Sequence, residues 1–214
     1  MGGTSSGADA EIIHRYFIIN KPYGMVSQFR SPDKVVLLNA LDFTFPEGTH
    51  AVGRLDKESE GLLLLTTNKK ITRLLFQDVN PHKRVYLVQV KNIPGTDGIQ
   101  LLERGLSLKG KRGESFVTMP AHVEIVKPPR NYLLAEHANA ERFVSTWLLI
   151  TINEGKYHQV RKMVAAIHHR CLRLIRVAIE DIELGELQPG GVKEITAVDF
   201  FRKLHICHSE TSCD

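Results

Sequence analysis

A polar stretch in the first third of this 214-residue sequence holds the side chains best suited to chemistry. Residues 51–66 read Ala-Val-Gly-Arg-Leu-Asp-Lys-Glu-Ser-Glu-Gly-Leu-Leu-Leu-Leu-Thr. Asp56 therefore stands close to two cations, Arg54 and Lys57, and a nearby positive charge keeps a carboxylate ionised. An ionised carboxylate can act as a nucleophile or a general base. Residue types alone favour a surface turn, in which Asp56 or Ser59 bonds to the local backbone.

The elements that must position this stretch are predicted from the spacing of apolar residues. The apolar run 61–65 predicts a buried strand, and a loop fixed to a core strand holds catalytic groups well. The remaining pattern has many short strands, few helices and no regular alternation of the two, which is typical of an α+β fold with a mixed, largely antiparallel sheet. The expected strands are 16–20, 61–67, 84–91, 106–108, 116–119, 121–126, 146–152, 172–177 and 179–184, and the expected helices are 35–41, 69–77, 99–104 and 157–168. A last strand and helix are expected after the turn at 190–191.

Positive charge is concentrated in one part of the chain. The formal net charge is +4, but residues 155–179 contain six Lys/Arg, three His and no acid. Such a one-sided block exceeds what solubility requires and favours a nucleic-acid partner over a merely solvated surface. We expect the two halves of the fold to flank a basic cleft with the Asp56 loop on its floor.

Composition limits the class of protein further. No apolar run approaches the roughly 18 residues that span a bilayer, and the Gly/Ser-rich start lacks the apolar core of a secretion signal. Three cysteines without a CxxC pair argue against a disulfide framework and a zinc site, and they suit a reducing cytoplasm. We expect a disordered lead at 1–14, a catalytic domain at 15–206 and a loose tail at 207–214. The cysteines are Cys171, Cys207 and Cys213.

Several ordered motifs resemble one enzyme family. The string 53–66 is similar to the Gly-Arg-Leu-Asp signature of ribosomal RNA pseudouridine synthases. Residues 20–24 resemble the family's Lys-Pro segment, 84–88 its tyrosine-bearing strand, and 154–163 its basic motif, followed by the strand at 172–176. The RsuA/RluB/RluE branch fits best, and the RluE type fits best within it. No S4-type RNA-binding domain is expected ahead of the core, and the loop from 127 to the Trp147 strand also resembles the RluE type.

The resemblance implies a reaction and a substrate. The enzyme would isomerise a specific uridine in large-subunit (23S-type) ribosomal RNA, after flipping the base out of the helix. The N1–C1′ bond is broken and the uracil is rejoined through C5, so no redox step or group donor is needed, and neither a cofactor nor a metal is expected. Structured RNA is the expected partner, with no membrane, for a cytoplasmic monomer.

The resemblance also assigns residues. Asp56 would attack C1′ or C6, or take a proton from C2′. Tyr86 would stack on the flipped uracil, and Arg161 would pair with Asp56. Contacts to RNA are expected from Arg54, Lys21, Lys57, Lys156, His158, Gln159 and Lys162.

Other interpretations stay open on residue types alone. Tyr86 can be an ordinary core tyrosine, and Arg161 an ordinary solvated arginine. A non-catalytic protein that binds or assembles ribosomal RNA would keep the fold, but it would not need Asp56 in an anion-binding groove. A metal-dependent nuclease would need a carboxylate or histidine cluster, and the pairs His168–His169 and His205/His208 lack a convincing partner set.

Overall fold

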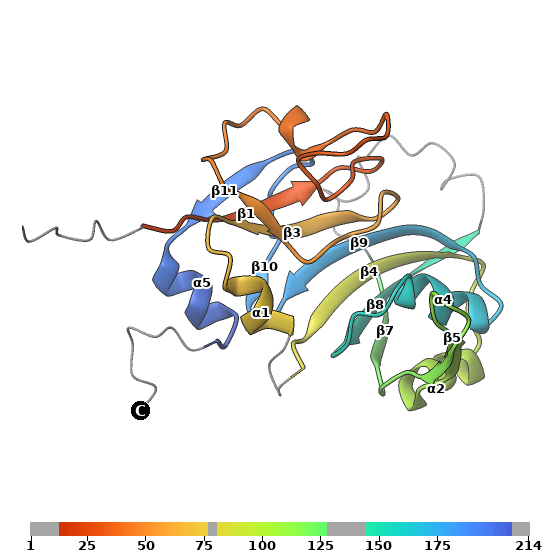
Figure 1. The fold of residues 1–214 in the computed structure, drawn as a ribbon. Coiled ribbons are helices and arrows are strands. Elements are labelled where there is room, and N and C mark those ends of the chain that lie inside the picture. Colours follow the sequence, from red (N-terminus) through yellow and green to blue (C-terminus); the bar gives the residue numbers. More distant parts are fainter. Residues whose placement is uncertain (1–12, 77–80, 128–143, 207–214) are drawn as a thin grey trace, which may run out of the picture.

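The computed structural model describes residues 13–76, 81–127 and 144–206. They form one curved sheet with helices packed on both of its faces (Figure 1). The expected features outside these ranges are the lead up to residue 12, the tail at 207–214 with Cys207 and Cys213, and most of the loop after 127.

The main sheet is mixed and largely antiparallel, as predicted. Its strands lie in the order β11-β1-β3-β9-β4-β8-β7, with β2 paired to β3 and β10 paired to β9. Within the described ranges every pair is antiparallel except β3 with β9. The strands are β1 (Tyr16–Lys21), β2 (His50–Val52), β3 (Glu60–Thr66), β4 (Arg84–Lys91), β7 (His122–Val126), β8 (Ser145–Ile152), β9 (Cys171–Ile179), β10 (Ile182–Glu183) and β11 (Val192–Ile195).

Both faces of the sheet are buried, because side chains alternate between them along each strand. In β3, Leu63 and Leu65 join one hydrophobic cluster, whereas Leu62 and Leu64 join a second. The first face, called here the pocket face, packs against α2, α4, a small hairpin and the segment between β1 and β3; the second packs against α1 and α5, which lie together in Figure 1. The bounds are η1 (Leu38–Ala40), α1 (Ile71–Phe76), α2 (Thr96–Arg104), α4 (Gln159–Ala166), α5 (Ala197–Lys203) and, for the hairpin, β5 (Ser107–Lys109) and β6 (Ser115–Val117).

The two halves of the sheet meet at a short parallel junction between β3 and β9, where Gly61 lies opposite Arg176. Gly61 has a φ of 95°, in the left-handed region that favours glycine. A Cβ at this position would also collide with the backbone carbonyl oxygen of Arg176. The glycine that ends the Asp56 segment is therefore required by the junction itself.

The bounds of several predicted elements differ from the structure. The strand expected at 172–177 is the longer β9, which ends at Ile179, and the strand expected at 179–184 is confirmed only as the two-residue β10, because the chain turns at Glu180, which has a φ of 45°. The helix expected at 35–41 is a single 3-10 turn, η1. The helix expected from 157 begins at Gln159, because His158 has a left-handed φ of 53°.

Candidate active site

A pocket of about 520 Å³ opens on the pocket face of the sheet. Its walls come from the turn at 53–59 and the segment 155–160, and strands β4 and β9 contribute side chains between them. The charge of the lining is strongly one-sided, since six cations surround one carboxylate. The charged lining residues are Arg54, Lys57, Arg84, Lys111, Lys156 and Arg176, together with Asp56.

Hydrogen bonds to the segment after β1 fix the turn that carries Asp56. The Ser27 hydroxyl accepts a bond from the Leu55 amide at 3.0 Å and donates one to the Leu55 carbonyl at 2.9 Å. The Gly24 amide donates to the Lys57 carbonyl at 2.9 Å. The residues before and after Asp56, Leu55 and Lys57, are therefore both fixed by hydrogen bonds. This suits a catalytic group that must meet its substrate in one orientation.

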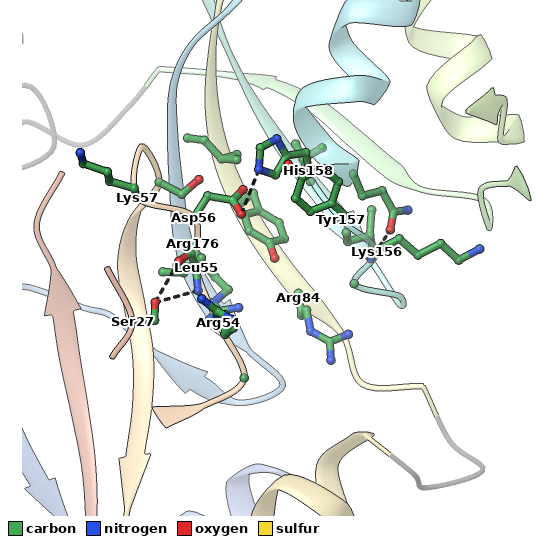
Figure 2. A pocket seen from close by; sticks show the side chains of 18 of the residues that line it. Ser27, Arg54, Leu55, Asp56, Lys57, Arg84, Lys156, Tyr157, His158 and Arg176 are labelled. Atoms are coloured by element: carbon green, nitrogen blue, oxygen red, sulfur yellow. Dashed lines mark hydrogen bonds and ion pairs between the residues drawn. The ribbon is translucent and has the colours of Figure 1, made fainter. Parts of the chain in front are cut away.

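His158 is the residue that contacts the Asp56 carboxylate. Its Nε2 lies 3.3 Å from Oδ1 of Asp56, and both side chains are about two-fifths exposed or less, at 38% and 36%. The His158 ring stacks on Tyr157 with a centroid distance of 3.9 Å. Figure 2 shows this contact across the pocket, with Lys57 and Lys156 pointing away from Asp56 in opposite directions. His158, expected on phosphates, thus lies at the carboxylate.

Arg161 does not pair with Asp56 among the described residues, and this part of the expectation is wrong. Its Nη2 donates instead to the Glu58 carbonyl at 2.6 Å, with Ser59 Oγ at 3.4 Å. His158 precedes α4 in a left-handed conformation and its side chain reaches the carboxylate, whereas Arg161 lies within α4 and reaches the base of the turn. Arg161 is placed to support the turn that carries Asp56.

Tyr86 lies on β4 and lines the pocket, with 8% of its surface exposed. It faces Ile150 on one neighbouring strand and Arg176 on the other. Its ring therefore belongs to a rigid sheet, while Asp56 belongs to a fixed turn, and the structure brings both to the same pocket. Their catalytic roles stay predictions.

Lys21 is not available to RNA, which corrects its expected role. The side chain is fully buried, and Nζ donates to the carbonyls of Pro22 at 2.9 Å and Met25 at 2.7 Å. Burial lowers the pKa of Lys21 to about 8, against the opposing influence of Glu60 and Asp56. Lys21 therefore stabilises the turn after β1 through these two hydrogen bonds.

Two more residues expected on phosphates are engaged within the protein. Gln159 is buried, accepting from the Lys156 amide at 2.9 Å and donating to Glu154 at 2.6 Å. The Nζ of Lys162 donates to the Lys109 carbonyl at 2.6 Å. Both therefore stabilise the loop around the pocket. Arg54, Lys57 and Lys156 are exposed at its rim and remain candidates for RNA contacts, although Nζ of Lys156 also lies 3.3 Å from Glu154.

Sequence reasoning missed two buried arginines of the pocket, Arg84 and Arg176. A signal for Arg84 existed: it stands two residues before Tyr86 on a predicted strand, so both must project from one face. The sequence held no comparable signal for Arg176. Its place in the pocket depends on the pairing of β9 with β3 and β4, which the sequence did not predict.

Replacing Lys21 by Met tests the structural assignment. Burial lowers the pKa of Lys21 from its ordinary value of 10.5 to about 8, so between these pH values the unfolded state holds more protons than the folded state. As the pH rises from 8 to 10.5, the wild-type free energy of unfolding should therefore increase relative to that of the variant, by at most about 3 kcal/mol. Urea unfolding at several pH values measures both free energies. If their difference did not change with pH, Lys21 would not be a buried charge. The salt dependence of RNA binding should be the same in both proteins.

Comparison with known sequences identifies relatives along most of the chain. The family model for RNA pseudouridylate synthase matches residues 15–166. The chain is 39% identical to ribosomal large subunit pseudouridine synthase E of Vibrio parahaemolyticus, over 85% of this chain and 74% of that protein. It is 35% identical to the synthase E of Xanthomonas axonopodis pv. citri, over 80% of this chain and 89% of that protein. Ribosomal small subunit pseudouridine synthase A of Yersinia pestis is 32% identical, over 85% and 69% respectively.

Solved structures share the fold. A crystal structure of a pseudouridylate synthase superposes with a TM-score of 0.72 at 28% identity, covering 90% of this chain and 74% of the other. Human RNA pseudouridylate synthase domain containing 1 has a TM-score of 0.53 at 15% identity, covering 89% and 82%, and at that identity it supports the fold alone.

Proposed function

The chain belongs to the RNA pseudouridylate synthase family, and on this basis we propose that it converts a specific uridine of large-subunit ribosomal RNA to pseudouridine with Asp56 as the catalytic carboxylate. The likeness to the large-subunit synthases E of two bacteria carries the choice of substrate. Among the described residues, Asp56 is the one carboxylate in a pocket lined by six cations, which supports this choice.

The reaction needs a carboxylate beside the sugar and a surface on which the base can rest. The N1–C1′ bond is broken, the uracil turns, and C5 is joined to C1′, so the product is an isomer of the substrate. Asp56 attacks C1′ or C6, or takes the C2′ proton. Tyr86 stacks on the uracil and helps to remove the C5 proton. Arg161 keeps the Asp56 turn in place through Glu58 and Ser59.

A uridine reaches this pocket only if its base leaves the RNA stack, which costs roughly a few kcal/mol. Exposed cations on the rim, Arg54, Lys57 and Lys156, offset that cost through contacts with phosphates, and Arg54 fills the gap that the base leaves. Loops and irregular helices are the favoured targets, because their bases are easier to splay.

The remaining properties follow from the same proposal. Residues 15–206 act as one catalytic domain, in the cytoplasm and as a monomer, without a cofactor. Within the described ranges, no helix has the length and apolar character needed to cross a membrane.

Modification of unmodified ribosomal RNA tests the substrate. Transcripts of large-subunit and small-subunit ribosomal RNA are incubated separately with the purified chain, and pseudouridines are mapped at nucleotide resolution. The expected result is one new pseudouridine in the large-subunit RNA. Modification of the small-subunit RNA alone would replace the proposed substrate, and no modification of either would reject it.

Chelation should leave the activity unchanged. No group of three or more metal-binding side chains occurs in the part of the chain that the structure describes, and the isomerisation proposed here needs no Lewis acid. Protein treated with EDTA should convert the large-subunit transcript at the rate of untreated protein, within about twofold. A loss that added metal restores would show that the mechanism is incomplete.

A further inference from the structure

Arg176 is a buried cation of the pocket to which the steps above give no role. It lies on β9 directly opposite Tyr86 of β4, and directly opposed residues of antiparallel strands project from the same face as close neighbours. Both residues line the pocket, and Arg176 is 5% exposed. A base that rests on Tyr86 would therefore lie next to this guanidinium.

The guanidinium is anchored at one end and unsatisfied at the other. Its Nε donates to the Leu62 carbonyl at 2.8 Å. Its Nη2 is shielded from water and has no hydrogen-bond partner among the described residues, and none of their carboxylates forms an ion pair with it. Arginine stays charged inside proteins, and a buried donor without a partner is rare enough to require an explanation. A bound ligand would supply the missing partner.

Depth in the pocket distinguishes the ligand of Arg176 from those of the other cations. Arg54, Lys57 and Lys156 are exposed at the rim, where phosphates can reach them. Arg176 rises from the sheet beside Tyr86, where a flipped nucleotide inserts its base and leaves its phosphates outside. The oxygens that come to this depth are the carbonyl oxygens of the uracil.

We propose that Arg176 is a catalytic residue whose guanidinium binds a uracil carbonyl oxygen and stabilises the negative charge that the base gains during the reaction. This rests on the proposed function, because it takes the base to be a uridine base held beside Asp56. Since Nη2 is covered in the free chain, entry of the base must displace the side chains that cover it.

Charge accumulates on the uracil by every route open to Asp56. When N1–C1′ breaks, by attack on C1′ or after loss of the C2′ proton, the electron pair leaves with the uracil as an anion delocalised over N1, O2 and O4. Attack on C6 places the pair on C5 and O4. After attack on C6, the N1–C1′ bond breaks in the next step. In every route C5 then bonds to C1′, while the bond from Asp56 to C1′ or C6 breaks or the proton taken from C2′ returns to that carbon. C5 loses its proton and N1 gains one, so atoms and charge balance and Asp56 is restored. A preorganised cation at a carbonyl oxygen favours each of these steps.

Two substrates and three variants test the proposal. The variants are Arg176→Met, Arg176→Lys and, as a charge-matched control, Arg104→Met at an exposed position on α2, outside the pocket and outside the basic block at 155–179. The substrates are the large-subunit transcript with uridine or with 5-fluorouridine, whose electron-withdrawing fluorine makes the base a better leaving group. Single-turnover consumption of each nucleoside at saturating RNA is measured, with affinity at several salt concentrations. The wild-type rate on uridine is measured first and tests the proposed function by itself.

The expected result is a fall of about 10²-fold in the single-turnover rate of Arg176→Met on uridine, with a clearly smaller fall on 5-fluorouridine. Arg176→Lys should recover part of the rate, since it keeps the charge and loses the fork of donors. Arg104→Met should match wild type. If Arg176→Met lost the same factor on both substrates, Arg176 would have a structural role. If this variant lost affinity and salt slope at normal turnover, Arg176 would contact a phosphate. Either result overturns the proposal, as would a wild-type rate of Arg176→Met on uridine. If Arg176→Met does not fold, Arg176→Lys on the two substrates gives the same comparison.

Discussion

Replacing Asp56 by Asn should abolish isomerisation while RNA binding survives. The amide keeps the size of the side chain but can neither attack carbon nor accept a proton as a carboxylate does, so we expect a loss of about 10³-fold or more. Affinity should stay the same or rise slightly, because the change removes the single negative charge from a lining that holds six cations.

Tritium release from RNA that carries 5-tritiated uridine reports this reaction directly, since C5 gives up its hydrogen when it bonds to C1′. Asp42→Asn provides a matched control, because Asp42 is exposed and outside the pocket. The control should release tritium at the wild-type rate. Substantial release by Asp56→Asn would remove Asp56 from its proposed role.

Arg161→Ala should cut turnover by about 10²-fold with little change in RNA affinity. The substitution removes the donors that hold the Glu58 carbonyl and the Ser59 hydroxyl, so the turn that presents Asp56 loosens. A small displacement of a catalytic group is enough for an effect of this size. Arg161→Lys should restore part of the rate, because one ammonium reaches one of the two acceptors but lacks the fork.

Lys156→Ala is the informative comparison for Arg161→Ala. Lys156 is exposed at the rim, so its loss should weaken RNA binding and reduce the log–log salt slope by about 0.7 to 0.9. Turnover at saturating RNA should stay normal, since a contact present in both ground and transition states does not accelerate chemistry. Binding isotherms at several salt concentrations with single-turnover rates separate the two variants. Lost affinity with normal turnover in Arg161→Ala would overturn its assignment.

The fold class and the candidate residues Asp56 and Tyr86 could be predicted from the sequence, because strand periodicity and ordered motifs are properties of short segments. The strand at 84–91 has the predicted bounds. The boundary expected near residue 178 was wrong because β9 pairs with β4 along nearly its whole length, and long-range pairing of this kind overrides a local preference to turn.

The directions of individual side chains were harder to predict, since residue type does not reveal burial. Lys21 and Gln159 are polar, yet both are buried and hydrogen-bonded within the protein. His158 has a left-handed backbone and directly precedes α4, and it is His158 rather than Arg161 that contacts the Asp56 carboxylate. A single dihedral angle of this kind is invisible to periodicity.

The parallel junction of β3 and β9 has a consequence for the newly made chain. The Asp56 turn precedes β3, whereas Arg176 and the 155–160 wall belong to the last third of the sequence, and β1 also pairs with β11 near the chain's end. Contacts between residues so distant along the chain close slowly, after local hairpins have formed. A polypeptide is synthesised from its N-terminus, so the pocket would remain incomplete until β9 leaves the ribosomal tunnel. We therefore expect enzymatic competence to arise only after β9 has been synthesised.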